Sequence, residues 1–189
     1  MKISAPTSLI ALGLSGLIAV AALPAVRAQV DPTPPFPTIE HQESAAQVTA
    51  NKAAVHHFFV TVWETGDLSL VDQYIEPDAK DYSPLGTGSG TASFKHIISM
   101  FHAALSNIKA NGTEIGDGDL VTHFWKIEGM HDLGPLMGVP PTHKMISLSG
   151  ATTVRVGADG KISARWSQLD MYGLLVQLGV IPPPKPEGK

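Results

Sequence analysis

The spacing of the apolar residues changes near the middle of this chain, and no other feature restricts the possible folds as much. Before Asn107 the apolar residues recur at helical spacing, as in the run from Val55 to Trp63. After Asn107 apolar and polar residues alternate, which is typical of strands with one buried and one solvated face. Helices followed by a run of antiparallel strands predict the α+β class.

The first half of the chain is predicted to contain helices around one short strand. Gly66 ends the first helix, Asp67 is a favoured N-cap for the second, and Pro77 stops the second. A glycine-rich loop, Ser83 to Gly90, precedes the last of these helices. The predicted helices are residues 43–65, 68–76 and 94–105, and the predicted strand is residues 79–82.

The second half is predicted to fold as an antiparallel meander. Its strands are separated by turn signals such as Asp159-Gly160 and by a long loop through Pro140-Pro141. One face of the sheet is expected to meet the helices. A strongly bent sheet over helices leaves a conical hollow, which is where pockets tend to form. The predicted strands are residues 108–115, 120–131, 145–156 and 161–169.

The start of the chain has the composition of a secretory signal peptide. Lys2 provides a basic start, Leu9 to Leu23 is an apolar run, and Val26-Arg27-Ala28 carries the small residues of a cleavage site. The alternative is an uncleaved anchor, although the run is shorter than the roughly 20 residues of a spanning helix. The protein is therefore expected to be secreted or periplasmic. The expected organisation is a signal peptide (1–28), a proline-rich linker (29–42), one folded domain (43–181) and a disordered tail (182–189).

The charge and the lack of cysteine exclude several classes of partner and site. Without Lys2 and Arg27, 11 basic residues stand against 17 acidic ones, a formal charge of −6. Nucleic acid and anionic membranes are held by Lys and Arg, so neither is an expected partner after signal cleavage. A chain without cysteine has no disulfides and no thiolate zinc sites.

Asp170 is the first candidate for chemistry. If the last strand alternates without interruption, Asp170 shares the inward face of Trp166 at the end of a mostly apolar strand. A carboxylate in an apolar hollow has a raised pKa and can exchange a proton near neutral pH. The alternative is that the strand ends near Gln168 and that Asp170 caps a helix from Met171 to Leu178.

Histidines and aromatic residues supply the other candidates. His123 and His131 share one strand face with Trp125, so both point into the cone if Trp125 does. His131 is then a second catalytic group that binds a substrate carbonyl or moves a proton; the alternative is a histidine bonded to water or backbone at the rim. Tyr82 lies at the cavity mouth or, alternatively, packs on the sheet. The predicted substrate-binding residues are Trp166, Trp125, Tyr82, Phe59 and His123.

The spacing of the remaining histidines predicts no metal site. His56 and His57 are adjacent on a helix and point in different directions. His96 and His102 are six residues apart, which does not place them on one helix face. A G-x-S-x-G nucleophile elbow is absent as well. We therefore predict no metal and no other cofactor.

Several short strings occur in a characteristic order over residues 51–179. They are Asn51-Lys52, Val62 to Leu68, Gly129-Met130-His131, Gly138 to Thr142 and Asp159 to Ile162, together with Trp166 and Asp170. This combination resembles the SnoaL-like polyketide cyclases, a branch of the nuclear-transport-factor-2-like superfamily. The resemblance implies a cone-shaped barrel, frequently dimeric, in which a strongly curved antiparallel or mixed sheet wraps over about three helices and encloses a ligand cavity. It also implies that Asp170 acts as acid and base in an aldol ring closure, without metal or organic cofactor.

Three functions fit these features. The first is an enzyme of cyclase, isomerase or hydrolase type that acts without a cofactor on a small apolar carbonyl compound, with Asp170 moving the proton and His131 orienting the substrate. The second is a binding protein that carries a small hydrophobic molecule in the same cavity. The third is an interaction module in which side chains fill the cavity and the sheet forms a homodimer face.

Overall fold

Residues 35–86 and 88–184 are described by this computed structural model, and they belong to one compact unit. The predicted signal peptide, the first part of the predicted linker and the end of the predicted tail lie outside the described residues. Along the described part, no helix is long and apolar enough to cross a membrane.

The described residues form one five-stranded sheet in the order β1-β5-β4-β3-β2. β1 and β5 run parallel while the other neighbours run antiparallel, so the sheet is mixed. β1 and β2 are its two edges, and the sheet is therefore open rather than a closed barrel. The predicted α+β class is confirmed. The strands are β1 (Ile75–Tyr82), β2 (Leu105–Asp117), β3 (Leu120–His131), β4 (Met145–Val156) and β5 (Ile162–Leu169).

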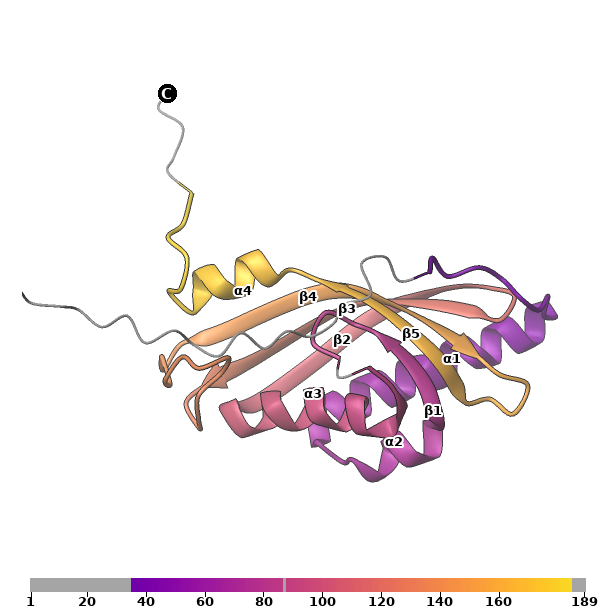
Figure 1. The fold of residues 1–189 in the computed structure, drawn as a ribbon, viewed down its shortest axis with the longest axis horizontal. Coiled ribbons are helices and arrows are strands. Elements are labelled where there is room, and N and C mark those ends of the chain that lie inside the picture. The colour runs from indigo at the N-terminus through magenta and orange to yellow at the C-terminus, as the bar shows by residue number, and fades with distance from the viewer. Residues whose placement is uncertain (1–34, 87, 185–189) are drawn as a thin grey trace, which may run out of the picture. The chain divides into compact units, whose positions relative to one another are not determined.

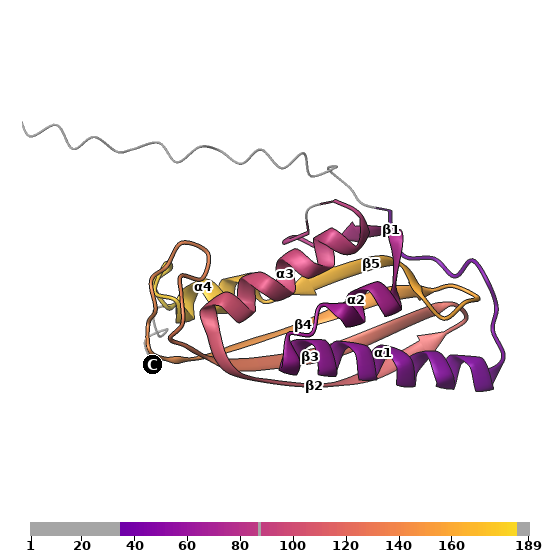
Figure 2. The same cartoon turned by 90° about the horizontal axis from the view of Figure 1, so that it is seen from below.

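The first three helices cover one face of this sheet (Figures 1 and 2). The first of them begins where the Ser44 hydroxyl accepts the Gln47 N–H at 3.1 Å. It ends at Gly66, whose φ of 70° lies in the left-handed region that glycine adopts without strain. The helices are α1 (Ala45–Thr65), α2 (Ser69–Tyr74), α3 (Gly90–Ala104) and a short α4 (Met171–Gln177) at the end of β5.

β5 contains one extra residue. Arg155 and Val156 are consecutive in β4, but their partners in β5 are Ala164 and Ile162. Ser163 therefore has no partner of its own in β4 and forms a bulge. A bulge of one residue exchanges the two faces of every position that follows it, because side chains alternate with a period of two.

The bulge overturns the predicted inward face of β5. Arg165 and Ser167 line the pocket on the helix side of the sheet. Trp166 instead stacks on Tyr82 and donates its ring N–H to the Pro35 carbonyl at 2.7 Å. The expectation that Trp166 faces the cavity is wrong because it assumed uninterrupted alternation from Ile162 onward.

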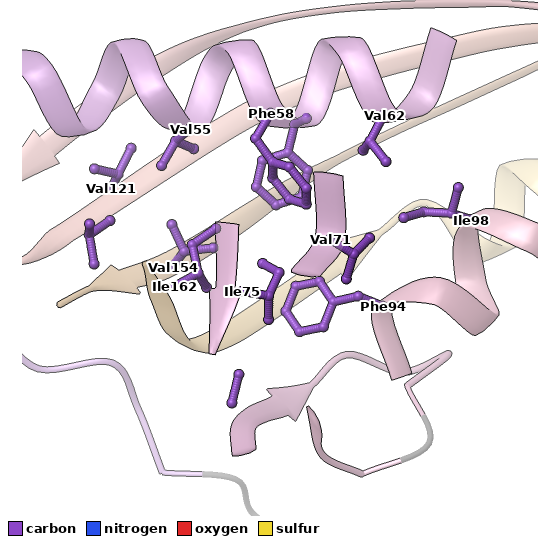
Figure 3. Packing of buried hydrophobic residues seen from close by; sticks show 13 residues of the cluster. Val55, Phe58, Val62, Val71, Ile75, Phe94, Ile98, Val121, Val154 and Ile162 are labelled. Carbon is purple, nitrogen blue, oxygen red and sulfur yellow. The ribbon is translucent and has the colours of Figure 1, made fainter. Parts of the chain in front are cut away.

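The hydrophobic core lies between the helices and the sheet. Figure 3 shows Phe58 of α1 and Phe94 of α3 converging with strand residues such as Val154. Phe58 is fully buried and stacks on Tyr74, with ring centroids 5.2 Å apart. A second cluster that includes Phe101 continues the core and borders the pocket described next.

Candidate functional site

An apolar pocket lies between α1, α3 and the inner face of the sheet. Its volume is about 30 Å³, which is room for roughly two water molecules. Trp63, Leu85 and Leu169 are partly exposed lining residues and mark its mouth. The described lining is apolar except for Ser83, Thr152, Arg165 and Ser167.

A chain of hydrogen bonds runs along the strand wall of the pocket. Trp125 Nε1 donates to Thr152 Oγ1 at 2.9 Å, and the hydroxyl oxygens of Thr152 and Ser167 are 3.0 Å apart. Thr152 and Ser167 are direct cross-strand partners in β4 and β5, which is why their side chains meet. The chain fixes the orientation of the Trp125 ring and places two hydroxyl groups beside Arg165.

A buried ion pair holds Arg165 in place. Its Nε donates to Asp81 Oδ1 at 3.0 Å and its Nη2 to Asp81 Oδ2, and the two side chains are 7% and 0% exposed. The Ser93 hydroxyl and the Ser83 N–H donate to the same carboxylate. The Phe94 ring lies 3.9 Å from the guanidinium carbon. These contacts hold the planar guanidinium in one orientation.

Arg165 lines the pocket, and Asp81 occupies one edge of its guanidinium. Among the described residues, Nη1 has no hydrogen-bond acceptor, whereas Nε and Nη2 are taken by Asp81. Arg165 is also the one charged residue of the described lining. The site can therefore stabilise a negatively charged oxygen, but the described lining offers no carboxylate or imidazole as a general base.

Asp170 lies outside the pocket and caps a helix. Its carboxylate accepts the Gly173 N–H at 2.8 Å, and the residue is exposed. β5 ends at Leu169 and α4 begins at Met171, which agrees with the alternative interpretation of this stretch. The expectation of an inward carboxylate in an apolar hollow is wrong, because the strand ends before Asp170 and a backbone N–H binds its side chain.

Replacing Asp170 with alanine is expected to lower the free energy of unfolding by about 1 kcal/mol, because an N-cap typically contributes that much. Asp170→Asn is the matched control: it keeps a capping oxygen and is expected to be nearly neutral. Urea denaturation measures both variants. A large loss of turnover or ligand affinity in Asp170→Asn at unchanged stability would contradict this assignment and return Asp170 to the chemistry.

His131 is fully buried but faces the β3–β4 loop instead of the pocket. Its Nδ1 accepts the Thr142 N–H at 3.3 Å, so Nε2 carries the proton and donates to the Gly134 carbonyl at 3.0 Å. Both ring nitrogens are thus used within the protein. The predicted position of His131 in the cavity is corrected: the side chain fastens a loop and does not line the pocket.

His123 points inward but stops short of the pocket. Its ring stacks on Phe59, which does line the pocket, with centroids 5.3 Å apart. Its Nδ1 lies 2.6 Å from Glu114 Oε1. Burial lowers the pKa of His123, and the nearby Glu114 carboxylate partly offsets this effect. His123 therefore packs behind Phe59, which lines the pocket, and is not itself a lining residue.

Two of the predicted substrate-binding residues line the pocket, and two others lie elsewhere. Phe59 and Trp125 are lining residues. Tyr82 and Trp166 are not: they stack on each other with ring centroids 5.3 Å apart, on the face of the sheet that carries the Pro35 contact. The Ser163 bulge corrects the predicted place of Trp166 in the cavity. Tyr82 is the register partner of Trp166 in β1 and packs on it, which agrees with the alternative that Tyr82 packs on the sheet.

The sequence interpretation missed Asp81 and Arg165. With uninterrupted alternation, Arg165 points away from the helices and needs no partner. One signal was available: Arg165 interrupts the otherwise mostly apolar stretch from Ile162 to Trp166, and a buried arginine requires a carboxylate. Which carboxylate pairs with it was not visible, because Asp81 is 84 residues away in the chain.

Comparisons with known proteins agree with this fold. The family model described as SnoaL-like polyketide cyclase matches residues 53–178. AclR, a candidate hydroxylase from Streptomyces galilaeus, is 25% identical with a TM-score of 0.65, and the alignment covers 74% of this chain and 87% of that one. A candidate polyketide cyclase from Acidithiobacillus ferrooxidans is 26% identical with a TM-score of 0.61, covering 69% and 94%. IdmH, a candidate polyketide cyclase from Streptomyces antibioticus, is 26% identical with a TM-score of 0.58, covering 70% and 99%. A comparison with curated protein sequences found no match.

Proposed function

The chain belongs to the SnoaL-like polyketide cyclase family, and on that premise we propose that its pocket binds a small enolisable carbonyl compound and stabilises negative charge on the carbonyl oxygen. Membership in this family supports a cofactor-free reaction of the cyclase or isomerase type. The observation that carries the proposal is Arg165, a cation at an apolar pocket that buried Asp81 holds in a fixed orientation.

The electrostatic environment supports this role. A charge acts over a longer range in an apolar hollow than in water, because the surroundings screen it less. Asp81 and Phe94 already orient the Arg165 guanidinium, so it needs little rearrangement when negative charge develops on a substrate. The hydroxyl groups of Thr152 and Ser167 lie on the same wall, and because one of them donates to the other, one hydroxyl proton of the pair remains to be donated to the same oxygen.

The proposed reaction begins at the carbon next to the carbonyl group. Its C–H bond breaks, the electron pair forms the C=C bond of an enolate, and the carbonyl oxygen takes the negative charge beside Arg165. The proton passes to water or hydroxide, because the described lining offers no carboxylate or imidazole. The enolate carbon then attacks a second carbonyl and closes a ring, and the alkoxide that forms takes a proton from water. If the enolate is conjugated with a C=C bond, it can instead be reprotonated at the far end of that system and yield an isomer.

The size of the pocket limits the substrate. A volume of about 30 Å³ admits little more than water, so a ligand must displace side chains at the mouth. Leu85, in the loop between β1 and α3, and Trp63, near the end of α1, are partly exposed and are the side chains that we propose move. A small, mostly apolar ketone or keto ester fits this description better than a long polar chain.

Hydrogen–deuterium exchange tests the proposal. The protein is incubated in D₂O with a small β-keto ester, and NMR follows loss of the proton between the two carbonyl groups. We expect the wild type to exchange that proton faster than buffer and Ser167→Ala to lose about 10²-fold or more of the acceleration, the usual effect of removing one such donor. Asp170→Asn is the matched control and is expected to keep the full rate.

Binding is measured in the same samples from the fluorescence of Trp63 and Trp125, which line the pocket. Binding with an exchange rate equal to that of buffer would replace the proposed enzyme with a binding protein for an apolar molecule. The lack of a titratable acid or base in the described lining favours this second candidate. If the protein binds none of a panel of small keto esters and accelerates exchange in none of them, both candidate functions are overturned.

Export and dimer formation are separate proposals. The basic start, the apolar run and the small residues near Ala28 support export of the protein through a cleaved signal peptide. The resemblance to a frequently dimeric family supports a homodimer. Neither proposal depends on the pocket chemistry.

A further inference from the structure

Three side chains from three different elements converge beside α1. His56 Nδ1 lies 2.8 Å and His123 Nδ1 lies 2.6 Å from the same oxygen, Oε1 of Glu114. One nitrogen or oxygen atom from each of the three residues lies within 4.8 Å of the other two. The two imidazole rings meet edge to face, with centroids 6.2 Å apart and an interplanar angle of 82°.

The fold builds this cluster from one contact within the β2–β3 hairpin and one long-range contact from α1. Glu114 of β2 and His123 of β3 are direct cross-strand partners, so their side chains leave the sheet side by side. α1 packs against β2 (Figure 2). His56 of α1 thereby reaches Glu114, with Nδ1 at 2.8 Å from Oε1. Phe59, one turn further along α1, stacks on the His123 ring at an interplanar angle of 14° and holds it from the other side.

Gly112 leaves the space that the His123 ring occupies. A Cβ atom at position 112 would lie 2.3 Å from His123 Cε1 and 2.5 Å from the Phe124 carbonyl oxygen. Any other residue would therefore displace the imidazole ring from its present position. The cluster therefore requires glycine at position 112 in addition to its three polar residues.

We propose that His56, Glu114 and His123 form a binding site for a divalent transition-metal ion such as Zn²⁺. Two imidazole nitrogens and one carboxylate oxygen are ligands that Zn²⁺ accepts, and three protein ligands leave a position for water. The same set of two histidines and one carboxylate also holds Fe²⁺ in other proteins. The His56 side chain is 45% exposed while that of His123 is 2% exposed, so the ion has a route from solvent and a firm inner ligand.

Binding requires a small expansion of the cluster. With metal–ligand bonds of about 2.0–2.1 Å, tetrahedral ligand atoms lie about 3.4 Å apart. The present separations of 2.6 and 2.8 Å are those of hydrogen bonds, so the distance from Glu114 Oε1 to each Nδ1 must lengthen by roughly 0.6–0.8 Å. Each Nδ1 gives up its proton to bind the ion, and the neutral ring then carries its proton on Nε2.

This metal site is separate from the apolar pocket between α1, α3 and the sheet. None of its three ligands is a pocket-lining residue, and Phe59 lies between His123 and the pocket. The charge of a bound ion is balanced in part by one carboxylate, which leaves the site cationic. A bound ion would thus cross-link α1, β2 and β3 in a chain that has no cysteine and therefore no disulfides.

Titration of the full chain, without a polyhistidine tag and after removal of metal by a chelator, tests the proposal. Calorimetry with Zn²⁺ is expected to show one equivalent bound with a dissociation constant of roughly 1 µM or lower. Co²⁺ is expected to give the visible absorption of a site with nitrogen and oxygen ligands. His56→Ala and Glu114→Gln should each weaken binding by about 100-fold or more, because even residues that merely orient a ligand contribute 10- to 100-fold.

His57→Ala is the matched control. His57 follows His56 directly in α1, but its side chain is exposed and it lies outside the cluster. It is expected to bind Zn²⁺ as the wild type does. Circular dichroism of each variant establishes that it is folded. The proposal is overturned if the wild type shows no saturable binding, if His56→Ala and Glu114→Gln bind as tightly as the wild type, or if His57→Ala loses as much affinity as they do.

Discussion

Replacing Arg165 with methionine is expected to lower the free energy of unfolding by about 3–5 kcal/mol, because it leaves the Asp81 carboxylate buried without its cation. Asp81→Asn is expected to have a similar cost for the converse reason. Urea denaturation with both single variants and the double variant measures the coupling. The double variant should lose less than the sum of the two, by about 0.5–3 kcal/mol, because both charges leave together.

Lys126→Met is the matched control for Arg165→Met. Lys126 forms an ion pair with Glu128 at 2.7 Å, but the two side chains are 46% and 42% exposed. Removing an exposed pair is expected to change the free energy of unfolding by about 0–1 kcal/mol. Equal losses in Lys126→Met and Arg165→Met would mean that the buried pair has no special weight. Asp81 would then not hold Arg165 firmly enough to make it a fixed hydrogen-bond donor in the pocket.

Replacing Phe101 with alanine is expected to lower the free energy of unfolding by about 3–5 kcal/mol and to open the pocket. The ring is 1% exposed, lines the pocket and meets Trp63 edge to face with centroids 5.4 Å apart. An apolar cavity of sufficient size stays dry and can bind benzene. We therefore expect benzene to raise the melting temperature of Phe101→Ala and to leave that of the wild type nearly unchanged.

Phe124→Ala is the control for the loss of a phenyl ring. Phe124 lies on the outer face of β3 and is 45% exposed, so its removal is expected to cost far less and to create no cavity. Benzene should leave this variant unchanged. If Phe101→Ala were as stable as Phe124→Ala, the Phe101 ring would not make the expected contribution to the core. If Phe101→Ala did not respond to benzene, the space that Phe101 fills would not be continuous with the pocket.

Most of the secondary structure could be predicted from the periodicity of the chain. The helix that ends at Gly66, the helix before Leu105 and the strands of the second half are present close to their predicted bounds. These elements depend on spacing within a few residues, on caps and on turns, and all of these are visible in the sequence. The first strand was predicted too short, because β1 begins at Ile75 and continues through Pro77.

The candidate site was predicted in part. Phe59 and Trp125 could be placed in the pocket because each lies on an apolar face that the periodicity defines. Trp166 was misplaced because one bulged residue, Ser163, shifts the pattern, and nothing in the local sequence indicates it. Asp170 was misplaced because a carboxylate after a strand fits both an inward group and a helix cap, and the choice depends on where the strand ends.

The amino-acid sequence by itself determined the class of fold, the order of helices and strands, the negative charge and the family, because each of these follows from local patterns or short strings of residues. The tertiary structure alone decided which charged groups meet. Arg165 with Asp81, and His56 with Glu114 and His123, are brought together by strand register and by the packing of α1 on the sheet. Arg165 and Asp81 are 84 residues apart and His56 and Glu114 are 58 residues apart, and such contacts depend on a bulge and a register that local spacing does not encode.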